Sequence, residues 1–291
     1  MLILIDSLGL GGAESLLLPF IRAAPNAALH VEVVSVAGRD DERRQMVPLL
    51  EELGIRPHFL DSHRLLTPGA VPRLVHIMNE TGCDIAHAHL ENAITLAAVA
   101  GRLVGRPTVC TFHHNPYDMP WRDTARERLA VLASSCCART IFVSAASMAG
   151  WERRYGRRTN WTVVRNGVDL GQFETPPVPS PLPEELGIPP QVPVALLAAS
   201  MREKKGHETA IAAWPDVLAR VPDARLLLVG SGEKEAFLRS EVAAHDLGAS
   251  VVFAGFRSDM PRLVQGSTLV LLPSESEALP TVLLEAGAAG R

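Results

Sequence analysis

Short apolar runs, many of them β-branched, alternate along the chain with longer segments whose apolar positions recur at helical spacing. The short runs predict buried strands and the longer segments predict helices. In the first part of the chain, strands are expected over 2–6, 31–37, 57–61, 84–90, 107–112, 140–144 and 161–166. Helices are expected over 12–24, 41–53, 69–81, 91–104 and 122–137. This alternation predicts βαβ units and a parallel sheet.

Residues 174–193, ETPPVPSPLPEELGIPPQVP, hold eight of the 22 prolines. Proline fixes φ and removes a donor, so a stiff hinge linker is expected here. The alternation then resumes, with strands expected over 194–200, 225–231, 250–256 and 268–273, helices near 206–220 and 233–246, a short helix after 256, and a helix from about Pro280. We therefore expect an α/β fold of two Rossmann-like domains facing a cleft: a first domain (1–173) and a second domain (194–291).

The length of 291 residues suits two domains, and the net charge of −4 gives no reason to expect nucleic acid. No apolar run approaches the roughly 20 residues of a membrane-spanning helix, and the start lacks a basic segment typical of a signal peptide. The four cysteines lack metal-type spacing and suit a reducing compartment. These features predict a cytoplasmic enzyme.

The chemically notable residues follow the predicted strands, where ligands of open parallel sheets bind. In the first domain they are Gly12, His87, His89, His113, His114 and Asn166; in the second they are Ser200, Arg202, Lys204, Lys205, Gly230, Gly232, Gly255 and Glu277. Each has a structural explanation as a turn glycine, a packed histidine or a solvated lysine. The histidine pair lacks a third ligand, so no metal is expected. LGLGGAE (8–14) fails the GxGxxG pattern, which disfavours a dinucleotide oxidoreductase.

Two glutamates, Glu277 and Glu285, flank the predicted start of the last helix, eight positions apart. Pro280 is expected to be the first helical residue. The N–H groups of Thr281 and Val282 would then point out of the amino end of the helix without partners. Such a helix end attracts a phosphate or a diphosphate. Carboxylates on either side can bind the hydroxyls of the two sugars in a nucleotide-sugar. The structural alternative is an ordinary helix with an acidic amino end.

The segment PSESEALPTVLLEA (273–286) resembles the E-x7-E signature of retaining glycosyltransferases with the GT-B fold, most closely family 4. Other segments agree in order along almost the whole chain: GGAE (11–14), DIAHAHL (84–90), TFHH (111–114), VS (143–144), VRNGVDLGQF (164–173), REKKGHETAIAA (202–213), LLLVGSGE (226–233) and VVFAGF (251–256). The combination is far more specific than any one of these motifs.

The resemblance implies a role for each matching residue. Gly12 would approach the donor diphosphate, His113 the transferred sugar, and Lys205 the diphosphate; Glu277 would hold sugar hydroxyls and Glu285 the ribose. Backbone N–H groups of Leu279 and Thr281 would bind phosphate, with Gly230 and Gly232 also on the donor side; His87, His89, His114 and Asn166 would lie on the acceptor side. Two positions depart from the family: Ser200 replaces its usual arginine, a role that Arg202 would take over, and Ala278 replaces a common glycine.

The expected function is transfer of a sugar from a nucleoside-diphosphate sugar to a glycan or lipid-linked hydroxyl, with retention and without a metal or other cofactor. The alternatives are a sugar-nucleotide epimerase of the same fold and a nucleotide-sugar-binding protein that does not turn over. Family members continue beyond the last helix, so the resemblance also implies a truncated chain with an incomplete second domain.

One group of arginines allows two interpretations: Arg122, Arg126, Arg128, Arg153, Arg154, Arg157 and Arg158. A solvated face, partly paired with Asp123, Glu127 and Glu152, is the simpler interpretation. The other is weak peripheral association with an anionic membrane, at its inner face, as in relatives that act on lipid acceptors.

Overall fold

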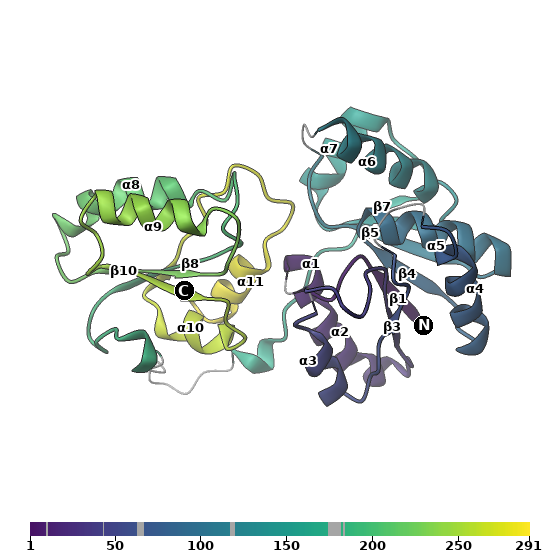
Figure 1. Cartoon of the computed structure of the whole chain (residues 1–291), viewed down its shortest axis with the longest axis horizontal. Coiled ribbons are helices and arrows are strands. Elements are labelled where there is room, and N and C mark those ends of the chain that lie inside the picture. Colours follow the sequence, from purple (N-terminus) through teal and green to yellow (C-terminus); the bar gives the residue numbers. More distant parts are fainter. Residues whose placement is uncertain (10, 43, 63–66, 117–119, 174–181, 183) are drawn as a thin grey trace. The chain divides into compact units, whose positions relative to one another are not determined.

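The computed structural model describes residues 1–9, 11–42, 44–62, 67–116, 120–173, 182 and 184–291. By its contacts the chain divides into two compact units, Met1–Asn166 and Gly167–Arg291 (Figure 1). Most of the predicted hinge, including 174–181 and 183, lies outside the described residues. Phe173 packs in the core of the second unit with Val194 and Leu196.

The first unit contains a seven-stranded parallel sheet in the order β3-β2-β1-β4-β5-β6-β7. Its strands are β1 (Leu2–Ile5), β2 (Glu32–Ser35), β3 (His58–Phe59), β4 (Ala86–His89), β5 (Thr108–Phe112), β6 (Arg139–Phe142) and β7 (Trp161–Val163). All seven coincide with predicted strands. Strands β1 to β3 extend the sheet in one direction, and strands β4 to β7 extend it in the other. The topological switch point therefore lies between β1 and β4.

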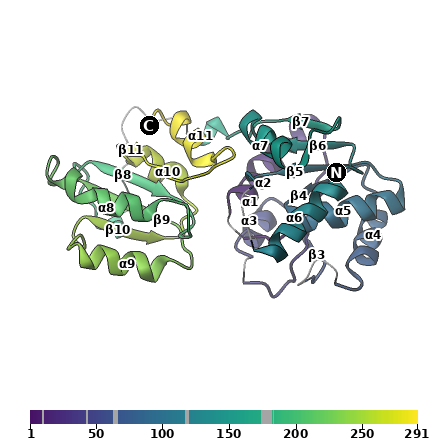
Figure 2. The ribbon, with the colours of Figure 1, turned by 90° about the horizontal axis from the view of Figure 1, so that it is seen from above.

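Helices cover both faces of this sheet. They are α1 (Gly12–Ser15), α2 (Leu17–Ala23), the short 3-10 turn η1 (Ala24–Ala27), α3 (Val47–Glu52), α4 (Ala70–Glu80), α5 (Glu91–Val104), α6 (Trp121–Ser134) and α7 (Ala145–Tyr155). A second 3-10 turn, η2 (Leu170–Gln172), belongs to the second unit. Leu2 and Leu4 of β1 face the core under α4–α7, whereas Ile3 and Ile5 face the core under α2 and α3. Strand alternation thus buries β1 on both faces, with α4, α5 and α6 side by side on one of them (Figure 2).

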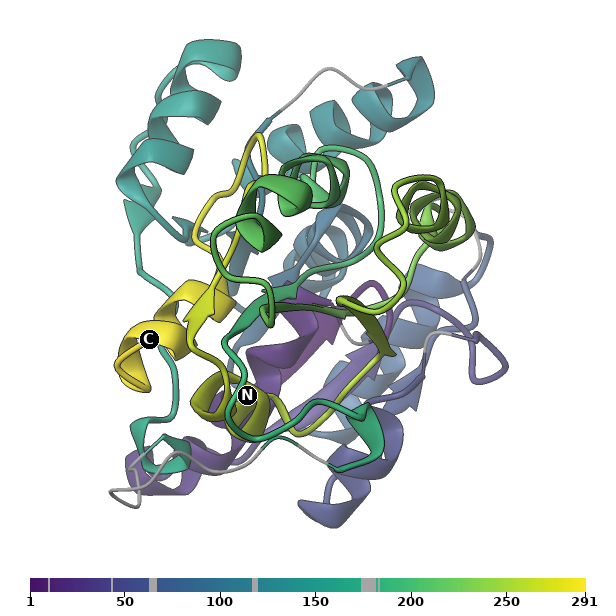
Figure 3. The same ribbon diagram turned by 90° about the vertical axis from the view of Figure 1, so that its left-hand side faces the viewer.

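The second unit contains a four-stranded parallel sheet in the order β10-β9-β8-β11. Its elements are η3 (Glu184–Leu186), β8 (Val194–Ala198), α8 (His207–Leu218), β9 (Arg225–Val229), α9 (Glu235–Ala244), β10 (Val251–Gly255), α10 (Met260–Gly266), β11 (Leu269–Val270) and α11 (Thr281–Ala288). Helices α8 and α9 pack on one face, and α10 and α11 on the other (Figure 3). The predicted α/β class with two parallel sheets is confirmed, and the switch point of this sheet lies between β8 and β11.

Two predicted helices are shorter or divided in the structure. The helix expected over 41–53 begins only at Val47, because Pro48 fits only in the first turn of a helix. The helix expected over 12–24 is divided into α1 and α2 at Leu16. Apolar periodicity does not register a break that leaves the buried face continuous.

Candidate active site

In the second unit the predicted donor residues gather where β8 and β11 end, at the switch point of the sheet. Lys205 follows β8 and Glu277 follows β11. The Lys205 Nζ atom donates a hydrogen bond of 2.6 Å to Glu277 Oε1, with side-chain exposures of 17% and 24%. The fold therefore joins two site residues that are 72 positions apart in sequence. Arg202 is exposed, and no contact of its side chain with either residue is among those found in the described part of the chain.

The two loops that carry this pair are bound to each other through their backbones. The Glu275 N–H donates to the Lys204 carbonyl at 3.0 Å, and the Ser274 hydroxyl donates to the Lys205 carbonyl at 3.4 Å. Gly206 has a φ of +76°, and a Cβ atom there would lie 2.2 Å from the Pro273 carbonyl oxygen. Only glycine allows this conformation together with this approach, so Gly206 sets the distance between the loops.

Gly230 and Gly232 hold a third loop, between β9 and α9, against the first. A Cβ atom on Gly230 would lie 2.2 Å from the Ala199 carbonyl oxygen, and one on Gly232 would lie 2.3 Å from that of Met201. Backbone hydrogen bonds from Met201 N to Ser231 O and from Lys234 N to Met201 O join the same loops. These glycines thus have a packing function; their donor-side role stays a prediction.

Helix α11 begins shortly after Glu277 in sequence. Pro280 is its N-cap residue, with φ −72° and ψ 125°, and makes no side-chain capping hydrogen bond. The prediction that Pro280 is the first helical residue was wrong by one position: its extended ψ leaves Thr281 as the first helical residue. The N–H groups of the first turn, starting at Thr281, lack partners within the helix. Glu285 lies in the second turn, and burial raises the pKa of its carboxyl group.

In the first unit the structure brings three of the predicted histidines together where β4 and β5 end. His89 Nδ1 and His113 Nε2 are 2.8 Å apart, and His87 Nε2 lies 2.8 Å from the Thr111 hydroxyl. The His87 and His89 rings are 4.2 Å apart, and those of His89 and His113 are 5.1 Å apart. Burial lowers the pKa of His87 to about 4 and that of His113 to about 3, and lowers the pKa of His89 well below its usual value. At neutral pH the three imidazoles are therefore neutral.

The backbone next to His113 is held by α7. The His114 carbonyl accepts hydrogen bonds from Trp151 Nε1 at 2.9 Å and from the Ser147 hydroxyl at 3.3 Å. The His114 ring instead contacts Glu91, with His114 Nε2 3.1 Å from Glu91 Oε1. Asn166 follows β7, which is separated from β5 by β6 in the sheet.

Asp6, at the end of β1, was missed by the sequence analysis. Its Oδ1 accepts from the Ala93 N–H at 2.7 Å, and its Oδ2 accepts from the Asn92 side chain at 3.0 Å. The carboxyl group therefore caps α5 across the switch point, 86 to 87 residues away in sequence. Leu90, directly before that helix, has a strained φ of 72°. The sequence signal for Asp6 was an acidic residue at the end of the first strand, ahead of the glycine loop. In that loop Gly12, at the start of α1, has open space where a Cβ atom would point.

Asp6 is expected to make folding stability depend on pH. Burial raises its pKa to about 7, and the hydrogen bonds from Ala93 and Asn92 oppose that shift. Because the folded pKa lies above the unfolded one, this contribution to stability is complete below about pH 4 and is lost as the pH rises through 7. We expect Asp6→Asn to remove a pH dependence of about 2 to 4 kcal/mol between pH 4 and pH 8. Urea unfolding at both pH values measures it, with exposed Asp84→Asn as the control; equal pH dependence in wild type and Asp6→Asn would contradict the assignment.

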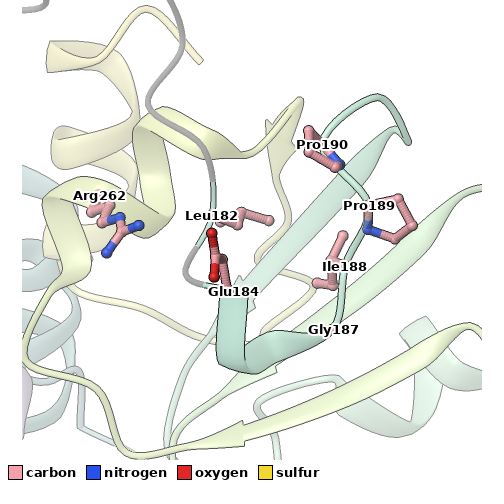
Figure 4. A pocket seen from close by; sticks show the side chains of 7 residues that line it. All are labelled: Leu182, Glu184, Gly187, Ile188, Pro189, Pro190 and Arg262. Atoms are coloured by element: carbon pink, nitrogen blue, oxygen red, sulfur yellow. The ribbon is translucent and has the colours of Figure 1, made fainter.

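Across the described residues, no group of three or more histidine, cysteine, aspartate or glutamate side chains is placed to hold a metal ion. One pocket in the second unit is lined by Leu182, Glu184, Gly187, Ile188, Pro189, Pro190 and Arg262 (Figure 4). None of these is a predicted site residue.

The arginine group is partly neutralised. Arg126 pairs with Asp123 at 3.1 Å, Arg154 with buried Glu127 at 3.3 Å, and Arg157 with Glu152 at 3.5 Å. These are the acidic partners that the simpler interpretation expected. Arg157 and Arg158 follow α7 instead of lying on it, because α7 ends at Tyr155. None of the helices in the described part of the chain is long and apolar enough to cross a membrane.

Comparison with known proteins identifies the class of protein to which this chain belongs. The sequence pattern of Glycosyltransferase Family 4 matches residues 10–172, and that of the Glycosyl transferases group 1 matches residues 181–291. The chain belongs to glycosyltransferase family 4. Its fold is GT-B-like: the structure of HepE from Anabaena in complex with UDP-glucose superposes with a TM-score of 0.80, at 26% identity, over 100% of this chain and 78% of that one.

Two relatives are similar over most of the chain. A GDP-mannose-dependent monoacylated alpha-(1-6)-phosphatidylinositol monomannoside mannosyltransferase of Corynebacterium glutamicum is 26% identical over 239 residues, 78% of this chain and 62% of the relative. A UDP-Gal:alpha-D-GlcNAc-diphosphoundecaprenol alpha-1,3-galactosyltransferase of Escherichia coli is 25% identical over 226 residues, 75% of this chain and 58% of the relative. The chain thus spans about three fifths of the length of these two relatives.

Proposed function

We propose that this protein transfers a sugar from a nucleoside-diphosphate sugar to a hydroxyl group of a glycan or lipid-linked acceptor, with retention of the anomeric configuration. Family membership supports the reaction class. The single observation that carries the assignment to residues is the contact between Lys205 and Glu277 at the switch point between β8 and β11.

The diphosphate is proposed to bind between the Lys205 ammonium and the amino end of α11. Negative charge grows on the diphosphate as the glycosidic bond to the donor breaks, and a fixed cation and helix N–H groups stabilise it without reorganising. Arg202, exposed on the same loop, would add a second positive charge. Because these groups supply the charge compensation, turnover is expected to persist in the presence of EDTA.

The hydroxyl groups of the donor are proposed to bind the two carboxylates. Glu277 precedes α11 and would accept from the transferred sugar, whereas Glu285, in the second turn, would accept from the ribose. The family resemblance gives contact with the transferred sugar to His113, whose imidazole is neutral because burial lowers its pKa. A neutral imidazole suits this role, because it binds a hydroxyl without attracting the diphosphate.

The identity of the donor is tested by binding. UDP-glucose, UDP-galactose, GDP-mannose and ADP-glucose are each titrated into the purified protein, followed by thermal unfolding. We expect the sugar nucleotides of one base to raise the melting temperature of the protein, since a ligand that binds only the folded state stabilises that state. Incubation with that donor, with and without a hydroxyl acceptor, then separates transfer from epimerisation. The proposal would be abandoned if none of the donors bound.

Weak association with an anionic membrane surface is proposed for the arginine group, whose members lie on α6, on α7 and shortly after α7. Three members of the group, Arg122, Arg128 and Arg153, are exposed on these helices. Flotation with vesicles of phosphatidylglycerol and phosphatidylcholine tests the association. Equal recovery with purely zwitterionic vesicles would leave the solvated-face interpretation.

A further inference from the structure

The ion pair between Lys205 and Glu277 has a consequence for what the site accepts. Lys205 is proposed to bind the diphosphate and Glu277 the sugar, yet their charged groups contact each other at 2.6 Å. A diphosphate oxygen that approaches Lys205 therefore competes with the Glu277 carboxylate for the same ammonium group. It also approaches a second negative charge, and the repulsion is only partly screened because both side chains are largely covered.

Hydrogen bonds between the two loops hold the Lys205 and Glu277 side chains within reach of each other. Glu275 N–H bonds to the Lys204 carbonyl, the Ser274 hydroxyl bonds to the Lys205 carbonyl, and Gly206 allows the loops to approach. Lys204 adopts a φ of 67°, which is uncommon for a residue with a side chain. Exposed ion pairs usually contribute little, but a pair held by its backbone loses less side-chain entropy when it forms.

Two ligands of the same base meet this pair differently. A nucleoside-diphosphate sugar brings hydroxyl groups, which donate to the Glu277 carboxylate and replace the hydrogen bond it loses from Lys205. A bare nucleoside diphosphate brings no such hydroxyl. Its terminal phosphate is also free to lose a second proton near neutral pH, which adds negative charge close to Glu277.

We propose that Glu277 is a specificity-determining residue that selects sugar-bearing diphosphates over the bare nucleoside diphosphate by competing for Lys205. After sugar transfer, the carboxylate loses its hydroxyl partners and pairs again with Lys205, which promotes release of the nucleoside diphosphate product. This inference rests on the proposed function. It adds that the Glu277 carboxylate weakens binding of the bare nucleoside diphosphate as well as strengthening binding of the sugar nucleotide.

The test compares two ligands in two variants by isothermal titration calorimetry. Glu277→Gln keeps the shape of the side chain and removes its charge. We expect it to tighten binding of the bare diphosphate, probed with UDP, GDP and ADP, by about three- to tenfold. It should weaken binding of the corresponding sugar nucleotide, probed with UDP-glucose, GDP-mannose and ADP-glucose. Glu275→Gln removes the same charge two residues away on an exposed position and should change either affinity less than about twofold.

The opposite signs separate this effect from simple damage to the loop, which would weaken both ligands together. The inference is overturned if Glu277→Gln binds the bare diphosphate no more tightly than wild type, or no more tightly than Glu275→Gln. In both cases the sugar nucleotide would still bind wild type, so the proposed function would stand. If neither ligand class binds the wild-type protein, the proposed function fails, and this inference fails with it.

Discussion

Replacing Lys205 by alanine should reduce turnover about a hundredfold or more while the second unit stays folded. The ammonium group is fixed beside Glu277 by the loops around Gly206, so it can meet the charge on the departing diphosphate without rearrangement. One preorganised contact of this kind typically contributes on the order of 3 kcal/mol to barrier lowering, which is a factor of more than a hundred in rate.

The measurement is kcat with the donor that the binding screen selects, together with the melting temperature of each variant. Lys204→Ala is the matched control, because it removes the same charge from the neighbouring, exposed position and keeps the backbone carbonyl that bonds to Glu275. We expect the control to lose less than about threefold in turnover. Turnover of Lys205→Ala within threefold of wild type would remove Lys205 from the site.

Gly206→Ala is expected to destabilise the second unit by about 2 to 5 kcal/mol. An alanine at φ +76° costs about 1 to 2 kcal/mol. Its Cβ atom would also lie 2.2 Å from the Pro273 carbonyl oxygen, and overpacking of this kind typically costs about 1 to 3 kcal/mol. Since the obstructing atom is backbone, the two loops must separate, and the Lys205–Glu277 contact should lengthen with them.

Gly248→Ala is the control for this substitution, because a Cβ atom on Gly248 meets nothing within 4 Å. Chemical unfolding monitored at Trp214, the tryptophan of α8, reports on the second unit. We expect Gly206→Ala also to weaken donor binding, whereas Gly248→Ala should leave it unchanged. Equal stability of the two variants would show that the loops do not depend on Gly206 for their approach.

Much of the fold could be predicted because each strand is a short buried run between amphipathic helices. The positions of Lys205 and Glu277 also followed from sequence, since the carboxyl ends of neighbouring parallel strands meet at one edge of a sheet. Their direct contact could not be predicted. It depends on the backbone of two loops, including the positive φ of Lys204 and of Gly206, which apolar periodicity does not record.

The histidines show the same limit in the first unit. Their spacing indicated that His87 and His89 share one face of β4, and this is where the structure has them. The bond between His89 and His113 depends on the register of β4 against β5, in which His89 lies opposite Thr111, two positions before His113. Asp6 escaped notice because its partners, Asn92 and Ala93, lie far along the chain.

The most direct test of the central claim is an experimental structure of the protein with the selected nucleoside-diphosphate sugar bound. We expect the diphosphate to lie within hydrogen-bonding distance of Lys205 Nζ and of the Thr281 N–H, with Glu277 bonded to the transferred sugar and Glu285 to the ribose. A nucleotide bound elsewhere on the chain, or bound with both glutamates directed away from it, would contradict the account.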